Sequence, residues 1–271
     1  MLNNNLFSTY FVSSTNDMAT EIISPLDQFE IRDILNLEVL GGNFHFSITN
    51  IAFYLITGTV IILVSGLLAT NYNKLVSNNW SIAQESLYVT IHNIVTSQIN
   101  PKNGQVYFPF MYTLFIFILI NNLIGMVPYS FASTGHFALT FALSFTIVLG
   151  ATILGFQKHG LKFFSLLVPA GCPLPLLPLL VIIELISYLA RNVSLGLRLA
   201  ANITAGHMLL SILSGFVYNI MNSGFIFFIL GLIPLLFIIA FSGLELAIAF
   251  IQAQVFVVLA SSYIKDGLDL H

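Results

Sequence analysis

The sequence predicts an all-α integral membrane protein, and its composition and hydropathy pattern carry that prediction. Hydrophobic residues make up 57% of the 271 residues and charged residues only 7%, whereas a soluble domain is typically about 25% charged. Several apolar stretches reach the roughly 20 residues that a helix needs to cross about 30 Å of hydrocarbon. None of them alternates as the strands of a membrane barrel do, so helices are the expected spanning structure.

The N-terminal half is expected to consist of a short first segment followed by three single spans. Residues 1–23 hold no lysine or arginine and no long apolar core, so they are neither a secretory signal nor a basic transit peptide. Residues 24–271 are expected to form one membrane domain, because the loops between apolar stretches are short. The single spans are expected at about 47–69, 107–126 and 136–156.

A helix that does not cross the membrane is expected at 81–99. Apolar residues such as Ile91 and Val95 recur there at helical spacing, with polar residues on the other faces. This pattern indicates an amphipathic helix at the membrane interface. Ser81 and Gln84 match a capping box at its start.

Two long helices are expected in the C-terminal half. The first extends from about 178 to 213, with Pro178 in its first turn, and its roughly 35 residues correspond to about 53 Å, well beyond the bilayer core. The second extends from about 225 to 264, after a turn at 219–224. Such helices must be strongly tilted, bent or broken, and we expect them to form a hairpin. The glycines that could serve as weak points are Gly196, Gly206 and Gly243.

The lysines predict the orientation of the chain. Loops rich in lysine and arginine stay on the side of the membrane where the chain is made. With five crossings, one side receives Lys74, Lys102, Lys158, Lys162 and Lys265. The C-terminus is therefore expected inside, and the acidic segment 21–38 outside.

Charged side chains within the long helices are the strongest functional signal. An arginine at the bilayer centre costs about 2.5–3.5 kcal/mol, and it cannot avoid that cost by losing its proton. Between residues 163 and 264 the charged residues are Glu184, Arg191, Arg198 and Glu245. Steps of seven residues turn a helix by about 700°, close to two full turns. The first three therefore share one helix face, and Asn202 falls near the same stripe.

A second polar group is expected around His207. Nine residues place His207 about 180° around the helix from Arg198, so it faces a different neighbour. On the second long helix, Glu245 and Gln252 share a face. A lone histidine is ordinarily a hydrogen-bonded structural residue, but His207 beside Glu245 would form a proton-relay site, because histidine titrates near neutral pH.

Structural alternatives are also compatible with these residues. Glu184 and Arg191 can form a buried structural ion pair. Glu245 can lie opposite Arg198 or nearer His207, depending on the helix register, and the first arrangement would give a neutral, inactive core. Small residues near Arg198 permit either the close approach of another helix or packing within the chain. These are Gly196, Ala200, Ala201, Ala205 and Gly206.

Other kinds of chemistry find no support in the sequence. There is no phosphate loop, nucleophile elbow or zinc-ligand spacing, so no catalytic site, metal or cofactor is expected. The single cysteine, Cys172, excludes an internal disulfide. A net charge of −3 from scattered groups argues against nucleic-acid binding. His92, His136 and His159 are expected at solvated membrane edges.

The segment SLGLRLAANITAGH, residues 194–207, resembles subunit a of the F-type ATP synthase, the stator subunit that forms the proton path beside the rotating c-ring. Resemblance to the fungal mitochondrial form covers most of the chain, including SPLDQFEIR from Ser24, VPAGCPLPLLPLLVIIELISYLAR from Val168 and SYIKDGLDLH from Ser262. It implies a mature chain that begins near Ser24, so that residues 1–23 would be a removed leader. It also implies a non-catalytic, multi-pass protein of the mitochondrial inner membrane. The implied partners are the c-ring, the peripheral stalk, other small membrane subunits, lipid and protons.

The resemblance also implies roles for individual residues. Arg198 matches the family's indispensable arginine, Arg191 its second, supporting arginine, and Glu184 the acid of the matrix-side half-channel. The residues that match the intermembrane-space half-channel and its polar neighbours are His207, Glu245, Asn202 and Gln252. Two offset half-channels would carry protons to and from c-ring carboxylates and so drive rotation and ATP synthesis. The N-terminus would face the intermembrane space and the C-terminus the matrix.

Two other functions compete with this one. A self-contained carrier would use the arginines to bind an anionic substrate, but it favours paired repeats or broken helices in both halves, and neither is evident in the sequence. A hydrophobic structural subunit of a respiratory complex would hold an inactive ion network. Co-purification separates the three, because a ring of carboxylate-bearing hairpins, isolated transport and redox cofactors each point to one function.

Overall fold

The computed structural model describes residues 26–39, 44–70, 78–99, 101–127, 130–167 and 176–268; the expected leader, Lys74 and Cys172 lie outside these ranges. Within them, five helices are long and apolar enough to cross a membrane. They are α2 (Asn50–Ala69), α4 (Pro101–Gly125), α5 (Phe137–His159), α6 (Leu177–Asn222) and α7 (Phe225–Leu268). The expected all-α membrane fold is confirmed.

A short β-hairpin, which is not among the expected elements, precedes α2. The segment consists of the 3₁₀ turn η1 (Asp27–Phe29) and the antiparallel strands β1 (Asp33–Val39) and β2 (Phe44–Thr49). Helix α2 therefore begins at Asn50 rather than at Ser47. Asn50 anchors the junction, because its side-chain NH₂ donates to the Glu30 carbonyl oxygen at 2.9 Å and its backbone N–H to the Arg32 carbonyl oxygen at 3.0 Å.

The expected amphipathic helix is observed as α3 (Asn79–Gln98). Its N-cap is Asn78, whose side-chain oxygen accepts a hydrogen bond from the first helical N–H at 2.8 Å. The predicted capping box of Ser81 and Gln84 is therefore wrong. Gln84 instead connects α3 to α4, since its side-chain oxygen accepts a hydrogen bond from the Tyr112 hydroxyl at 2.9 Å.

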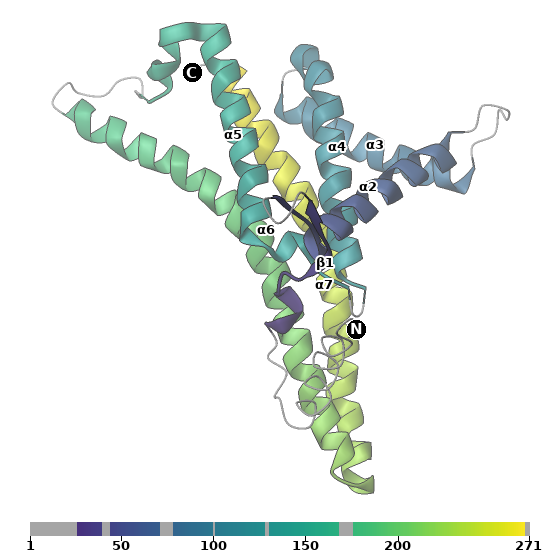
Figure 1. Cartoon of the computed structure of the whole chain (residues 1–271). Helices are drawn as coiled ribbons and strands as arrows, with labels where there is room; N and C mark the ends of the chain where they lie inside the picture. Colours follow the sequence, from purple (N-terminus) through teal and green to yellow (C-terminus); the bar gives the residue numbers. More distant parts are fainter. Residues whose placement is uncertain are drawn as a thin grey trace, which may run out of the picture.

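Helices α6 and α7 form a long, uninterrupted hairpin. Helix α6 continues to Asn222 rather than ending near residue 213, and the turn narrows to Ser223 and Gly224. Gly224 has φ of 151°, a conformation that favours glycine. None of the glycines expected as weak points breaks either helix. Figure 1 shows instead that α6 curves along its length.

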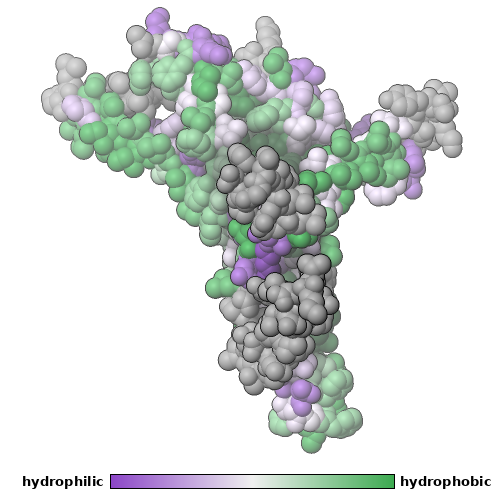
Figure 2. Space-filling view, viewed as in Figure 1, coloured by the Kyte–Doolittle hydropathy of each residue, from purple (hydrophilic) through white to green (hydrophobic). Residues whose placement is uncertain are grey.

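The buried core lies where α4, α5, α6 and α7 meet. Its fully buried large side chains include Phe115, Ile118, Leu195, Leu199, Phe256 and Val257. By contrast, the half of α7 before Glu245 and most of α2 expose apolar side chains, and Figure 2 shows hydrophobic surface over the distal end of the α6–α7 hairpin. Such surface is stable against lipid tails or other membrane helices.

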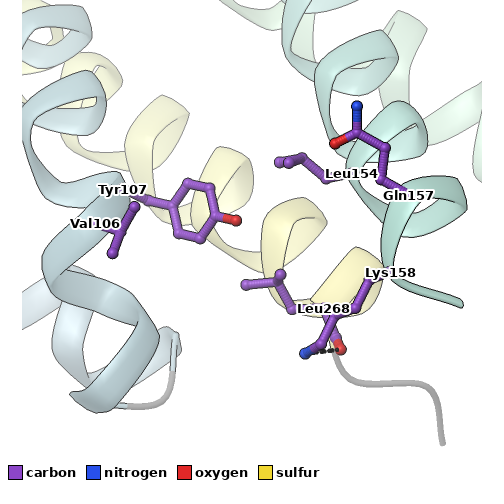
Figure 3. Close-up of a pocket in the computed structure, with 6 residues that line it drawn as sticks. All are labelled: Val106, Tyr107, Leu154, Gln157, Lys158 and Leu268. Atoms are coloured by element: carbon purple, nitrogen blue, oxygen red, sulfur yellow. Dashed lines mark hydrogen bonds between the residues drawn. The ribbon is translucent and has the colours of Figure 1, made fainter.

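The ends of α5 and α7 are tied together beside the start of α4. These three helices line a cavity of about 370 Å³. Figure 3 shows six of the residues that line it. Lys158 Nζ donates to the Leu268 carbonyl oxygen at 2.7 Å, and His159 Nε2 lies 2.9 Å from the same oxygen. These groups satisfy a carbonyl that a helix leaves without an internal partner at its C-terminus. His159, expected at a solvated edge, is thus part of a helix-end contact.

Candidate functional site

Arg198 lies on the exposed face of α6. It borders an open groove of about 480 Å³ that α6 lines with Ala190, Val193, Ser194, Leu197, Arg198 and Ala201. Among the described residues, no carboxylate forms an ion pair with its guanidinium. The small and apolar lining therefore presents an unneutralised positive charge to whatever lies outside the chain.

Arg191 lies two helical turns before Arg198 on α6, in a cluster of charged side chains. Its Nη2 donates to Glu184 Oε1 at 3.0 Å, and its Nη1 lies 3.8 Å from Asp266 Oδ2 on α7. We call Glu184, Arg191 and Asp266 the acidic cluster. The Glu184 and Arg191 side chains are 40% and 44% exposed, so this is not the buried structural pair that the sequence leaves open.

His207 and Glu245 form the centre of a second cluster. His207 Nε2 lies 3.8 Å from Glu245 Oε1, and the two side chains are only 15% and 6% exposed. Beside them, Asn202 Nδ2 donates to Gln252 Oε1 at 2.9 Å. We call these four residues the histidine cluster. Of the two registers that the sequence leaves open, the structure has the one in which Glu245 lies near His207.

The histidine cluster has more polar capacity than the surrounding chain satisfies. His207 Nε2, both Glu245 carboxylate oxygens and Gln252 Nε2 are buried and have no hydrogen-bond partner in the described part of the protein. Buried polar groups almost always have partners, and water is the usual one where a polar site has room for it. The cluster is therefore suited to a hydrated path.

The two clusters lie at different levels of the α6–α7 contact. Glu245 lies beside His207. His207 is nine residues from Arg198, about 14 Å along α6 at about 1.5 Å per residue, so Glu245 does not lie opposite Arg198. The interpretation in which Glu245 neutralises Arg198 is therefore wrong. Buried apolar side chains of α6 and α7 fill the core between the clusters, namely Leu195, Leu199, Phe256 and Val257.

Some of the small residues around Arg198 pack within the chain, and others remain open to the approach of another helix. A Cβ atom on Gly196 would lie 3.2 Å from a backbone oxygen of α5, and one on Gly206 would lie 2.5 Å from Glu245 Oε1. These glycines therefore serve packing within the chain, as does the fully buried Ala200. Small residues still exposed for another helix are Ala201 and Ala205.

Two polar residues of the site, Asn122 and Asp266, are not among the site residues predicted from the sequence. Asn122 on α4 donates its side-chain NH₂ to the Ala249 carbonyl oxygen at 3.3 Å, one helical turn from Glu245. The sequence contained a signal for Asn122, because two adjacent asparagines interrupt an apolar membrane span. Polar side chains in such a span carry a considerable free-energy cost. Asp266 of the acidic cluster was also missed, because it lies beyond the apolar part of α7.

His136 is half-buried, and one of its ring nitrogens is withdrawn from solvent. It follows the 3₁₀ turn η2 (Ser133–Gly135), and its ring stacks on Phe131 with a centroid separation of 5.0 Å. Its Nε2 is buried without a hydrogen-bond partner in the described ranges, as is Nδ1 of His92 on α3. The expectation of solvated edge positions is therefore wrong for these ring nitrogens.

Comparison with known proteins decides the family. The family described as ATP synthase A chain matches residues 51–265, which include every site residue expected from the sequence. The chain belongs to the ATP synthase A chain family. Its membership confirms the resemblance seen at residues 194–207. It also makes the chain a proton-translocating, non-catalytic membrane subunit of the stator.

Named relatives agree over nearly the whole chain. ATP synthase subunit a of Neurospora crassa is 79% identical over 95% of this chain and 98% of its own length. The Podospora anserina protein of the same name is 78% identical over 92% of this chain and 94% of its own. At greater distance, that of Eremothecium gossypii is 50% identical over 96% of this chain and all of its own. A carrier and a respiratory-complex subunit are therefore no longer competing functions.

Proposed function

We propose that the two clusters are parts of separate half-channels that pass protons to and from carboxylates on a rotating c-ring. The observation that carries the proposal is Arg198, an exposed cation at a level between the clusters, beside a core filled with apolar side chains. A proton crosses such an apolar layer only at great cost. Transfer between the half-channels therefore requires a carrier that moves along the exposed face of α6.

The histidine cluster forms the intermembrane-space half-channel. His207 and Glu245 relay protons inward, and the hydrogen-bonded pair of Asn202 and Gln252 extends the polar path towards the level of Arg198. A ring carboxylate that accepts the proton becomes neutral and can face lipid without the cost of a buried charge.

The acidic cluster forms the matrix half-channel. When the ring carboxyl arrives beside Arg198, the fixed guanidinium stabilises its ionised form, and the proton leaves towards Glu184. Arg191 supports this step by holding Glu184 in place at 3.0 Å. Arg198 also repels any proton that would pass directly from one half-channel to the other. The membrane potential supplies about 2.3 kcal/mol per proton for each 100 mV.

The proposal extends to partners and to membrane orientation. The c-ring faces the Arg198 groove, while the peripheral stalk, other small membrane subunits and lipid cover the exposed apolar surfaces of α2 and the distal hairpin. The protein lies in the mitochondrial inner membrane, with its N-terminus towards the intermembrane space and its C-terminus towards the matrix. The distribution of lysines supports this orientation. Labelling of single cysteines placed near Arg32 and Lys265 with an impermeant maleimide, in intact inner-membrane vesicles, tests it.

The central test uses Arg198 in the reconstituted holoenzyme. We expect Arg198→Ala to abolish ATP-driven proton pumping almost completely, and Arg198→Lys to lose most of it, because lysine keeps the charge but lacks the planar guanidinium. Arg32→Ala serves as the control, since the Arg32–Glu30 pair is exposed, with side-chain exposures of 70% and 62%. Substantial pumping by Arg198→Ala would refute the proposal.

A further inference from the structure

Phe29 makes close contacts with two histidines near the proposed intermembrane-space half-channel. Its ring centroid lies 6.2 Å from that of His207, with an interplanar angle of 86°, and 6.4 Å from that of His136, with an angle of 75°. Both arrangements are edge-to-face, the geometry that aromatic rings prefer. No role follows for Phe29 from the motifs of the long helices, since it belongs to η1 at the other end of the sequence.

Phe29 sits on the backbone where η2 meets α6. A Cβ atom on Gly135 would lie 2.9 Å from Phe29 Cε1, so the ring occupies the space that a side chain there would need. The Gly135 carbonyl oxygen accepts a hydrogen bond from Thr204 Oγ1 at 3.0 Å, one helical turn from His207. Phe29 therefore covers the junction that holds the turn carrying His207.

The segment around Phe29 is anchored to α2. Asn50 binds the residues that follow Phe29, because its side-chain NH₂ donates to the Glu30 carbonyl oxygen and its side-chain oxygen accepts from the Arg32 backbone N–H at 3.4 Å. The Phe29 backbone N–H donates to the Leu26 carbonyl oxygen at 2.9 Å, which closes the 3₁₀ turn. The position of the ring is thus fixed by hydrogen bonds that do not involve the half-channel.

Each imidazole next to Phe29 has one ring nitrogen that is withdrawn from solvent. Nε2 of both His207 and His136 is buried, and neither has a hydrogen-bond partner in the described ranges. At 3.8 Å, His207 Nε2 and Glu245 Oε1 are too far apart for a hydrogen bond that would fix the imidazole, and open access to solvent would favour separate hydration of both groups. An apolar ring held edge-on to the imidazole opposes both its rotation and its hydration.

We propose that Phe29 is a positioning residue of the intermembrane-space half-channel, which shields His207 from bulk water and keeps its imidazole turned towards Glu245. This inference rests on the proposed function, because it assigns His207 and Glu245 to the proton path. Phe29 acts through His207 and exchanges no proton itself. Protons then reach Glu245 through the polar groups beside the ring, and direct access from the bulk phase is restricted.

The test measures the exposure of His207 together with transport in the reconstituted holoenzyme. Diethylpyrocarbonate acylates accessible neutral imidazoles, and peptide mass mapping reports the rate at His207 alone. We expect Phe29→Ala to raise that rate about fivefold to tenfold and to lower ATP-driven pumping by a similar factor, from the loss of one aromatic contact. Phe29→Leu, which keeps apolar cover, is expected to restore both values to within about twofold of the wild type. Phe53→Ala is the control, since Phe53 is exposed on α2, packs edge-on against Tyr54 at 5.8 Å, and makes no ring contact with His92, His136 or His207.

The outcomes separate this inference from the proposed function. An unchanged acylation rate at His207 in Phe29→Ala overturns the shielding role, and unchanged pumping overturns the positioning role. If the complex with Phe29→Ala does not assemble, the same two measurements on Asn50→Ala test the inference, because that change loosens the segment without altering the ring. Glu245→Gln is measured in parallel. Wild-type pumping by Glu245→Gln would contradict the half-channel itself, whereas its loss together with an inert Phe29→Ala would contradict only this inference.

Discussion

Replacing Gly206 with alanine tests whether the position of the Glu245 carboxylate matters for transport. The new Cβ atom would lie 2.5 Å from Glu245 Oε1 and 2.8 Å from its Cδ, whereas non-bonded heavy atoms come into contact at about 3.5 Å. The carboxylate must therefore retreat by about 1 Å from a site that is almost fully buried. Overpacking of this kind costs about 1–3 kcal/mol, so we expect ATP-driven proton pumping to fall by about tenfold or more.

The assay is proton uptake by vesicles that contain the reconstituted complex, normalised to assembled enzyme. Gly215→Ala is the matched control, because it makes the same change in the same helix at a position where a Cβ atom meets nothing within 4 Å. Shortening the carboxylate with Glu245→Asp should relieve the clash, so the double variant is expected to be less impaired than the two single effects combined. Equal pumping by Gly206→Ala and Gly215→Ala would refute the reasoning.

The remaining predictions concern the other cluster and the core. We expect Glu184→Gln to leave assembly intact, because the half-exposed pair with Arg191 contributes less than about 1 kcal/mol, yet to lower pumping several-fold; unimpaired pumping would argue against a role for Glu184 in proton exit. We expect Gly267→Ala to destabilise the subunit by about 1–3 kcal/mol, because its Cβ atom would lie 2.7 Å from the Ala151 backbone oxygen. Thermal unfolding of the detergent-solubilised complex, with Gly243→Ala as control, measures this loss, and equal stability of the two variants would contradict the packing argument.

The long helices and the stripe of charges were predictable because hydropathy and helical spacing determine them. The register between α6 and α7 was not, since it depends on which residue closes the turn. Asn219, expected in that turn, lies within α6, and the chain reverses only at Ser223 and Gly224. Whether Glu245 faces Arg198 or His207 follows from this difference, and no local pattern reveals it.

The β-hairpin could have been predicted, whereas the surroundings of His136 could not. Polar and apolar residues alternate over residues 35–39 of the first strand and over Phe44–Thr49, which is a strand signal, but the strongly apolar stretches that follow dominate the hydropathy pattern. The partial burial of His136 depends on the ring of Phe131 in the preceding loop and on that of Phe29, which comes from η1 more than 100 residues earlier in the chain. The contact with Phe29 arises only from tertiary structure.

The unpaired guanidinium of Arg198 also bears on biogenesis. A chain that has folded and inserted alone still displays this charge to the hydrocarbon, and no described carboxylate of its own neutralises it. Under the proposed mechanism, a ring carboxylate is the missing counter-charge. Folding of this protein is then energetically complete only after assembly, and the orphan chain is expected to turn over faster than the assembled one.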